Sequence, residues 1–451
     1  PAAITYGADG GNFFDGITYW TGFGEDHILI KDTLARNVAG LVGLTTLNTG
    51  LGDDTVHVDL DSDDSAFVLN AQGPYENLQK FRDNDFVDAS ASSIPLIIFG
   101  GQHDDTITGG TAQDIIFGDL GFVAFVDEIN GENVISAVGS NVDDMYVGYG
   151  NTYHPTAALA TGQLMRIETI VYANGGVDTI TGLSGTDYIL GGDMGDTLNG
   201  STDAAVIVGD YGFIDFHTAT LHDALEGQIN RIQSLSLGLG GDDIITGTTS
   251  NDVLIGGEGN DAITALAGDD MILGDAGYVD FVKFDQDLSD LDEIGSFVSP
   301  YDGDDTILAG DGADMIIAGG SVTQDEIDTG TGNNVVIGDL GVITGKDAGP
   351  GQAGGLPFTL DTVRSTSQSV GGTDRITQYG GEDVIIAGVG RDYVTAAADE
   401  NGRDIIAGDG AIITFRTPET DGTHVANLIQ TYQAAVGDVD EIGAGAGGDI
   451  V

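Results

Sequence analysis

A nine-residue repeat is the feature that most constrains what this chain can fold into. The unit GGEGNDAIT, from Gly256 to Thr264, fits G-G-x-G-x-D-x-U-x at every position, where U is a large apolar residue, and steps of nine residues keep the register. Blocks of such units, here called nonads, begin at Gly100, Ala173, Gly238, Pro300 and Ser369. A sustained repeat of this kind predicts a solenoid in which each nonad supplies one turn and one short strand.

The two halves of the nonad have different physical roles. The x-U-x tail is a minimal strand, and its apolar residue points inward because side chains alternate between the faces of a strand. The G-G-x-G-x-D half is a turn, since glycine reaches backbone conformations closed to other residues. Its carbonyl oxygens and the aspartate carboxylate at position six are hard oxygen ligands, which suit Ca²⁺.

The charge of the chain supports the same interpretation. There are 73 acidic and 13 basic residues, a formal net charge of −60, yet 41% of the 451 residues are hydrophobic. A compact core with this charge repels itself unless counter-ions bind, so the carboxylates form either a solvated surface or a set of metal ligands. Nucleic acid is excluded as a partner because no basic patch exists. Cysteine is absent, and no apolar run reaches the 18 residues of a membrane-spanning helix.

The nonads identify the region 99–451 as similar to the RTX (repeats-in-toxin) family of calcium-binding repeats. The resemblance implies an all-β parallel β-roll, or β-solenoid, built of tandem modules with several Ca²⁺ ions in the turns. It also implies that two nonads form one coil and that each ion lies between turns of neighbouring coils. Nonads two apart are then partners, which pairs Asp243 with Asp261, Asp252 with Asp270, and Asp178 with Asp196.

The predicted metal ligands are the aspartates at position six and three glycines of the best-fitting nonad. They are Asp26, Asp54, Asp105, Asp114, Asp178, Asp187, Asp196, Asp243, Asp252, Asp261, Asp270, Asp305, Asp314, Asp325, Asp374, Asp383, Asp392, Asp404 and Asp449, with Gly256, Gly257 and Gly259. Two positions depart from the pattern. Ala205 stands where Asp187 needs a partner, and Asn334 removes one charge.

A larger repeat lies above the nonads. Each block ends in a GDxGxV-like signature, which starts at Gly118, Gly209, Gly274, Gly338 and Gly408. A spacer follows and ends in a related apolar stretch: RIETIVY, RIQSLSL, LDEIGSF, LDTVRST and VDEIGAG, starting at Arg166, Arg231, Leu291, Leu360 and Val439. The spacers form hairpins or enlarged coils of one continuous solenoid, or they are linkers between separate beads; their regular apolar residues favour the first alternative.

These signals divide the chain into seven segments. Residues 1–98 are a degenerate, β-rich solenoid, because only the units around Asp26 and Asp54 keep the repeat. Five modules follow at 99–172, with a long spacer, 173–237, 238–299, 300–368 and 369–443. Residues 444–451 begin a further repeat that is cut short, so we expect the array to continue in a longer parent protein.

No catalytic motif emerges, and we expect no enzyme activity. The seven histidines are scattered, no HExxH is present, and the glycines around Ser184 belong to a nonad. One hypothesis is a calcium-stabilised rod in a giant surface adhesin, matrix protein, S-layer or filament, with calcium, cell-surface components or other copies of itself as partners. The alternative is the calcium-dependent export and folding module of a secreted enzyme or toxin. Either is expected outside the cell or on a bacterial surface, secreted without an N-terminal signal peptide.

Overall fold

The computed structural model describes residues 17–33, 44–71, 83–129, 132–139, 163–171, 175–218, 227–235, 238–284, 291–321, 323–346, 359–367, 369–397, 402–415, 426–431 and 439–451. The regular structure in these segments is β-strand throughout. None of them contains a helix long and apolar enough to cross a membrane. The chain divides into an N-terminal unit, Pro1–Tyr188 with Asp215–Gln228, and a C-terminal unit, Ile189–Ile214 with Ile229–Val451. Strands β14 (Asp187–Gly192) and β17 (Gly212–Phe216) contain two of the three points where the chain passes between units.

The N-terminal unit contains two parallel sheets and an antiparallel one. In hydrogen-bonded order, the first sheet holds β1 (Ile17–Phe23), β3 (Leu44–Leu51), β5 (Ala66–Asn70), β7 (Leu96–Phe99) and β9 (Ile115–Phe117). The second holds β2 (His27–Ile30), β4 (Thr55–Val58), β6 (Phe86–Asp88), β8 (Thr106–Thr108) and β13 (Thr179–Thr181). The antiparallel sheet holds β11 (Glu132–Gly139), β10 (Gly121–Ile129) and β12 (Gln163–Thr169).

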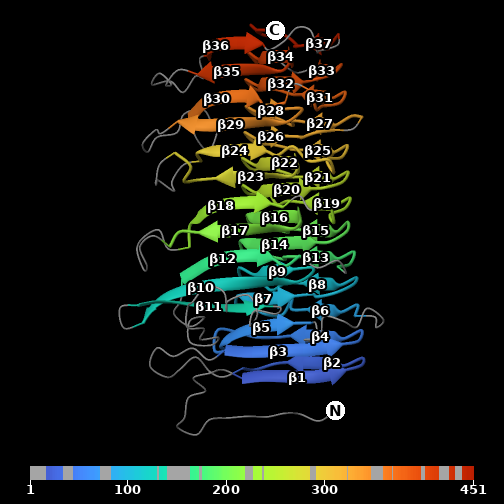
Figure 1. Ribbon diagram of the computed structural model, residues 1–451, viewed down its shortest axis with the longest axis vertical. Coiled ribbons are helices and arrows are strands. Elements are labelled where there is room, and N and C mark those ends of the chain that lie inside the picture. Colours follow the sequence, from blue (N-terminus) through green and yellow to red (C-terminus); the bar gives the residue numbers. More distant parts are fainter. Residues whose placement is uncertain are drawn as a thin grey trace. The chain divides into compact units, whose positions relative to one another are not determined.

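The C-terminal unit repeats this plan, and Figure 1 shows its strands stacked coil upon coil from green to red. Its first sheet holds β16 (Ala205–Asp210), β20 (Val253–Gly257), β22 (Met271–Asp275), β26 (Met315–Ile317), β28 (Val335–Ile337), β32 (Val384–Gly388) and β34 (Ile405–Asp409). Its second sheet holds β15 (Thr197–Asn199), β19 (Ile244–Thr246), β21 (Ala262–Thr264), β25 (Thr306–Leu308), β27 (Glu326–Asp328), β31 (Arg375–Gln378), β33 (Tyr393–Ala396) and β37 (Glu441–Gly443). The fold is therefore the expected all-β parallel β-roll.

The spacers form hairpins rather than linkers in the C-terminal unit. Their strands make an antiparallel sheet in the order β18 (Ile229–Ser234), β23 (Gly277–Asp280), β24 (Glu293–Ser296), β29 (Gly341–Lys346), β30 (Thr359–Ser365), β35 (Ala411–Phe415) and β36 (Ala426–Thr431). We call this antiparallel sheet, in each unit, the lateral sheet. One expectation was wrong: VDEIGAG is not a spacer strand, because β37 pairs in parallel with β33 in the second sheet. The nearly identical LDEIG from Leu291 forms β24 in the lateral sheet, so the local sequence does not decide between the two places.

The core lies between the two parallel sheets. In the second sheet, the register aligns Ile245, Ile263 and Ile307, each at most 1% exposed. Ile244, next to Ile245, is 53% exposed, so these strands alternate between core and solvent. Each inward side chain contributes about 1.5–3 kcal/mol by leaving water. The predicted inward set is buried throughout: Ile180, Ile189, Leu198, Ile245, Leu254, Ile263, Ile272, Ile307, Ile316, Ile376, Ile385, Val394 and Ile406.

Several strands of the first sheet are buried on both faces. Every residue of β20, VLIGG, is buried, and so is every residue of β32, VIIAG. Strands β24 and β30 of the lateral sheet lie close to β22 and β28, so the lateral sheet covers the outer face of the first sheet. This arrangement explains why alternate nonads end in an apolar run instead of an alternating tail.

Candidate calcium-binding turns

The position-six aspartates before the second sheet form a hydrogen-bonded ladder. The backbone N–H of Asp243 donates to Oδ1 of Asp261 at 2.8 Å, and Asp261 N–H donates to Oδ1 of Asp305 at 2.8 Å. In the C-terminal unit this ladder runs through Asp196, Asp243, Asp261, Asp305, Asp325, Asp374, Asp392 and Asp440. In the N-terminal unit it runs through Asp26, Asp54, Asp85, Asp105 and Asp178. Each rung joins neighbouring coils, so it fixes their register.

A second ladder precedes the strands of the first sheet. In the N-terminal unit, Leu96 N–H donates to Asp114, whose own N–H donates to Oδ1 of Asp187 at 2.8 Å. In the C-terminal unit the ladder runs through Ala205, Asp252, Asp270, Asp314, Asn334, Asp383, Asp404 and Asp449. Ala205 donates its N–H but presents no carboxylate, and Asn334 accepts through Oδ1. Ala205 and Asn334 therefore occupy the ladder positions that the nine-residue spacing predicts for them.

In many ladder aspartates the second carboxylate oxygen is left without a donor, whereas Oδ2 of Asp114 and Asp252 accepts a backbone N–H within its own turn. Within the described part of the chain, no hydrogen-bond partner contacts Oδ2 of Asp54, Asp85, Asp105, Asp243, Asp261, Asp270, Asp305, Asp314, Asp325, Asp374 or Asp392. All of these residues are at most 3% exposed. A buried ionised carboxylate oxygen is costly unless a positive charge or proton reaches it.

The pKa values of these aspartates reflect that cost. Burial, together with the neighbouring carboxylates of Asp305 and Asp243, holds the pKa of Asp261 well above its usual range. Burial and the Asp305 carboxylate raise the pKa of Asp325 to about 9. Burial also raises the pKa of Asp270 to about 8, and that of Asp314 to about 7. The turns therefore favour either protons or cations over bare negative charge.

A carbonyl oxygen meets the carboxylate at the first glycine of the nonad. The point that a Cβ atom of Gly256 would occupy lies 2.3 Å from Oδ2 of Asp261 and 2.2 Å from the carbonyl oxygen of Gly274 in the next coil. The same two kinds of oxygen converge at Gly100, Gly109, Gly191, Gly209, Gly247, Gly274 and Gly338. At Gly200, where Ala205 replaces the aspartate, the nearest atom is the Ala205 Cβ. The missing side chain thus makes room for a recurring pair of oxygens.

The glycines at position four form a column of carbonyl groups. A Cβ on Gly303 would lie 1.7 Å from the carbonyl oxygen of Gly259, and one on Gly312 would lie 1.7 Å from that of Gly268. Gly259 itself has φ +109°, in the region that favours glycine. Only glycine allows this close stacking of turns, and its carbonyl oxygens face the next coil.

All nineteen predicted aspartates lie in one of the two ladders. The predicted pairs Asp243–Asp261 and Asp252–Asp270 are adjacent rungs, whereas Asp178 and Asp196 belong to different units. Of the predicted glycines, Gly256 and Gly259 direct carbonyl oxygens at the glycines of adjacent coils, and Gly257, at φ +130°, lies against Asp210. Their role as metal ligands stays a prediction.

The nonad pattern did not identify two members of the ladder. Asp85 and Asp440 both precede an x-U-x tail, in NDFVD and VDEIG, but the glycines that a nonad has at positions one, two and four are missing before them. The D-x-U-x spacing alone was the signal that could have found them. Burial raises the pKa of Asp85 to about 9.

The donor set fits calcium. At Gly100, Gly209, Gly256, Gly274 and Gly338, a buried carboxylate oxygen without a hydrogen-bond partner in the described structure meets a backbone carbonyl oxygen. Such oxygen ligands suit Ca²⁺ in flexible geometry. Among the described residues, no three acidic or histidine side chains converge as a metal-holding group. When bound, Ca²⁺ would supply the positive charge that the facing oxygens require.

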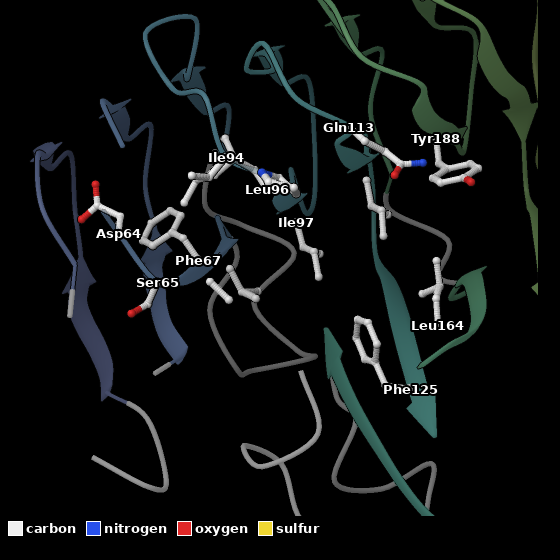
Figure 2. Close-up of a pocket in the computed structure, with 14 residues that line it drawn as sticks. Asp64, Ser65, Phe67, Ile94, Leu96, Ile97, Gln113, Phe125, Leu164 and Tyr188 are labelled. Atoms are coloured by element: carbon white, nitrogen blue, oxygen red, sulfur yellow. The ribbon is translucent and has the colours of Figure 1, made fainter. Parts of the chain in front are cut away.

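A separate cavity of about 230 Å³ lies in the N-terminal unit. Figure 2 shows Phe67, Leu96 and Ile97 from the first sheet facing it, with Phe125 and Leu164 from the lateral sheet. Its polar lining is Asp64, Ser65, Gln113 and Tyr188, and none of these four belongs to a ladder. The Tyr188 ring packs edge-on against the Phe216 ring, with 5.6 Å between the two ring centroids. Burial raises the pKa of the Tyr188 hydroxyl to about 12.

Comparison with known protein families agrees with this geometry. A model of the RTX calcium-binding nonapeptide repeat matches residues 97–122, 172–207, 237–277, 301–322 and 370–402. No curated protein matches the chain. The matched segments contain the position-six aspartates Asp105, Asp178, Asp252, Asp305 and Asp374, among others. The chain therefore contains RTX calcium-binding nonapeptide repeats in several segments, on a parallel β-roll.

Proposed function

We propose that this chain is a calcium-stabilised structural or adhesive segment of an extracellular protein, and that it is not an enzyme. The observation that carries the proposal is the buried Oδ2 atom, without a described donor, which recurs in coil after coil beside a carbonyl oxygen. Carboxylates used in this way hold neighbouring coils together. A chain with a net charge of −60 can stack such turns only when cations neutralise them.

The proposed extracellular location rests on the calcium concentration outside cells. Extracellular calcium modules bind in the range of about 10⁻⁴–10⁻³ M, which matches the millimolar concentration outside cells. The chain has no cysteine, so disulfides cannot stabilise it there. Folding is then coupled to calcium binding, and the chain stays unfolded until it leaves the cell.

Solution scattering and electron microscopy of the purified chain, in millimolar Ca²⁺ and in EGTA, test this proposal. We expect an elongated particle or an end-to-end assembly with calcium, and an expanded coil without it. A particle shape and a β-content that stay the same when EGTA removes calcium would contradict the proposal. A compact monomer that folds on calcium, without elongation or assembly, would instead favour the export and folding module of a secreted enzyme or toxin.

A further inference from the structure

The spacers interrupt the roll inside a turn, between the second and third positions of a nonad. Gly274 and Asp275 precede a spacer, and Asp305 follows it. A Cβ on Gly274 would lie 2.2 Å from Oδ2 of Asp305, just as one on Gly256 would lie 2.3 Å from Oδ2 of Asp261 within an intact nonad. Gly274 is therefore position one of a turn whose position six comes after the spacer.

The same relation recurs at other spacers. A Cβ on Gly209 would lie 1.9 Å from Oδ2 of Asp243, and one on Gly338 would lie 2.5 Å from Oδ2 of Asp374. The GDxGxV signature is thus not the end of a block. Its Gly-Asp pair opens a split turn, which the first nonad after the spacer completes.

The signature aspartate closes the split turn. It stands at position two, where an intact nonad such as that of Gly256 has glycine. Its Oδ1 accepts the position-four N–H beyond the spacer: Gly303 to Asp275 at 3.0 Å, Gly241 to Asp210 at 3.1 Å, and Gly176 to Asp119 at 3.2 Å. These bonds span 28, 31 and 57 residues, yet they join the same two positions.

The other oxygen of the signature aspartate reaches the next coil. Oδ2 of Asp275 accepts Gly320 N–H at 2.5 Å, and Oδ2 of Asp210 and Asp339 accept the N–H groups of Glu258 and Val389. Glu258 and Val389 stand at position three of intact nonads. Gly320 takes the equivalent place, because Gly319 before it lies against Asp275 as Gly257, before Glu258, lies against Asp210. Asp210, Asp275 and Asp339 are each 1% exposed. Hydrogen bonds to an ionised acceptor are the stronger class, so one carboxylate holds the cut turn and seats the coil that follows.

We propose that the signature aspartates Asp119, Asp210 and Asp275 are positioning residues, each of which closes a turn cut by a spacer so that the turn binds Ca²⁺ as an intact turn does. In an intact nonad the covalent bond between positions two and three keeps the glycine and the aspartate together. In a split nonad the ends are joined only through a long insertion, and the carboxylate replaces that constraint. The inference rests on the proposed calcium-binding function.

The test compares Asp275→Gly in two backgrounds. In the full chain this change removes the clamp while the spacer remains. Deletion of residues 276–301 from the same variant joins Gly274 and the substituted position directly to Asp302, Gly303, Asp304 and Asp305, which restores an uninterrupted nonad. Bound calcium is counted by equilibrium dialysis, and amide hydrogen exchange follows Gly303 and Gly320. Asp59→Asn, a neutralisation at an exposed position outside both ladders, is the control.

We expect Asp275→Gly to lose at least one bound Ca²⁺ and to exchange the Gly303 and Gly320 amides about tenfold faster or more, because their acceptor is gone. The deletion variant should regain the lost ion, and Asp59→Asn should keep all of them. An unchanged ion count and unchanged exchange in Asp275→Gly would overturn the inference. The deletion also removes a hairpin of the lateral sheet. If the deletion variant does not fold for that reason, the exchange rates of the Gly303 and Gly320 amides in Asp275→Gly decide whether the inference holds. A wild-type chain that binds no calcium would refute the proposed function itself, which is a different outcome.

Discussion

The backbone N–H of Asp243 donates a 2.8 Å hydrogen bond to Oδ1 of Asp261 in the next coil, while Oδ2 of Asp261 has no partner in the described structure. One oxygen of the same carboxylate therefore holds two coils in register, and the other remains for a cation. The same arrangement recurs at Asp243, Asp305 and Asp325 of this ladder and at Asp270 of the other, and it leads to the following predictions.

Removal of calcium should unfold the roll reversibly. The facing carboxylates repel one another without cations, and binding supplies the folding free energy in such metal-dependent units. Far-ultraviolet circular dichroism should show β-structure in millimolar Ca²⁺, its loss in excess EGTA, and its return when calcium is restored. Equal amounts of Mg²⁺ should restore less, since Mg²⁺ demands a tighter octahedral geometry. A β-spectrum indifferent to chelation would refute the prediction.

Asp261→Asn should weaken calcium binding but stabilise the metal-free chain. The amide oxygen can still accept the Asp243 N–H, whereas the buried charge disappears. We expect the affinity at the adjoining sites to fall about tenfold, which is about 1.4 kcal/mol. Calcium titration by calorimetry measures the first effect, and residual β-content in EGTA measures the second. Asp59→Asn is again the control, and no more β-structure in EGTA for Asp261→Asn than for the wild-type chain would contradict the argument.

Gly312→Ala should destabilise the calcium-loaded roll, and Gly380→Ala should not. The new methyl on Gly312 would lie 1.7 Å from the Gly268 carbonyl oxygen, whereas no described atom lies within 4 Å of a Cβ on Gly380. Overpacking of this kind costs about 1–3 kcal/mol, because backbone must move. Thermal unfolding in saturating Ca²⁺ compares the two variants. Equal melting temperatures would show that the turns do not stack as closely as described.

Without metal, the roll should be more stable in mild acid than at alkaline pH. Burial raises the pKa of Asp305 to about 8 and, with the Asp305 carboxylate, that of Asp325 to about 9, from a usual 3.8. The folded form therefore holds protons that the unfolded chain has released, and its stability falls as pH rises from about 4 to about 9.

Calcium reverses this dependence, since it competes with the same protons and its affinity rises with pH. Far-ultraviolet circular dichroism of the metal-free chain at pH 5 and pH 8, and calcium titrations at both, check the two signs. Greater metal-free stability at pH 8 than at pH 5 would be the contrary result.

Arg231→Ala should lower stability without changing the number of bound ions. Its guanidinium Nη1 contacts Oδ2 of Asp280 at 2.5 Å and stacks over the Tyr278 ring at 4.5 Å, and all three residues belong to the lateral sheet. We expect a loss of about 1–2 kcal/mol, because the Asp280 side chain is 8% exposed and loses its charged partner. The more exposed pair of Arg403 and Glu382 is the control, and Arg403→Ala should cost little. A changed calcium count in Arg231→Ala would mean that the lateral sheet shapes the turns.

The nonad by itself determined the local structure. The alternation of side chains along a strand and the conformational freedom of glycine in a turn are local properties of the chain. The inward residues such as Ile263 and the position-six aspartates such as Asp261 could therefore be read from spacing alone. The parallel β-roll and its calcium ligands followed from the resemblance that this spacing carries.

The tertiary structure alone decided which coils meet across the insertions. Rungs of the ladder span 18 residues between Asp243 and Asp261 but 73 between Asp105 and Asp178, with similar hydrogen bonds. Loop-closure entropy grows only slowly with length, so a long spacer does not prevent the same stacking, and the sequence separation does not reveal the partner. For the same reason Asp275 looked like part of a strand signature, and only its contacts with Gly303 and Gly320 show it as the clamp of a split turn.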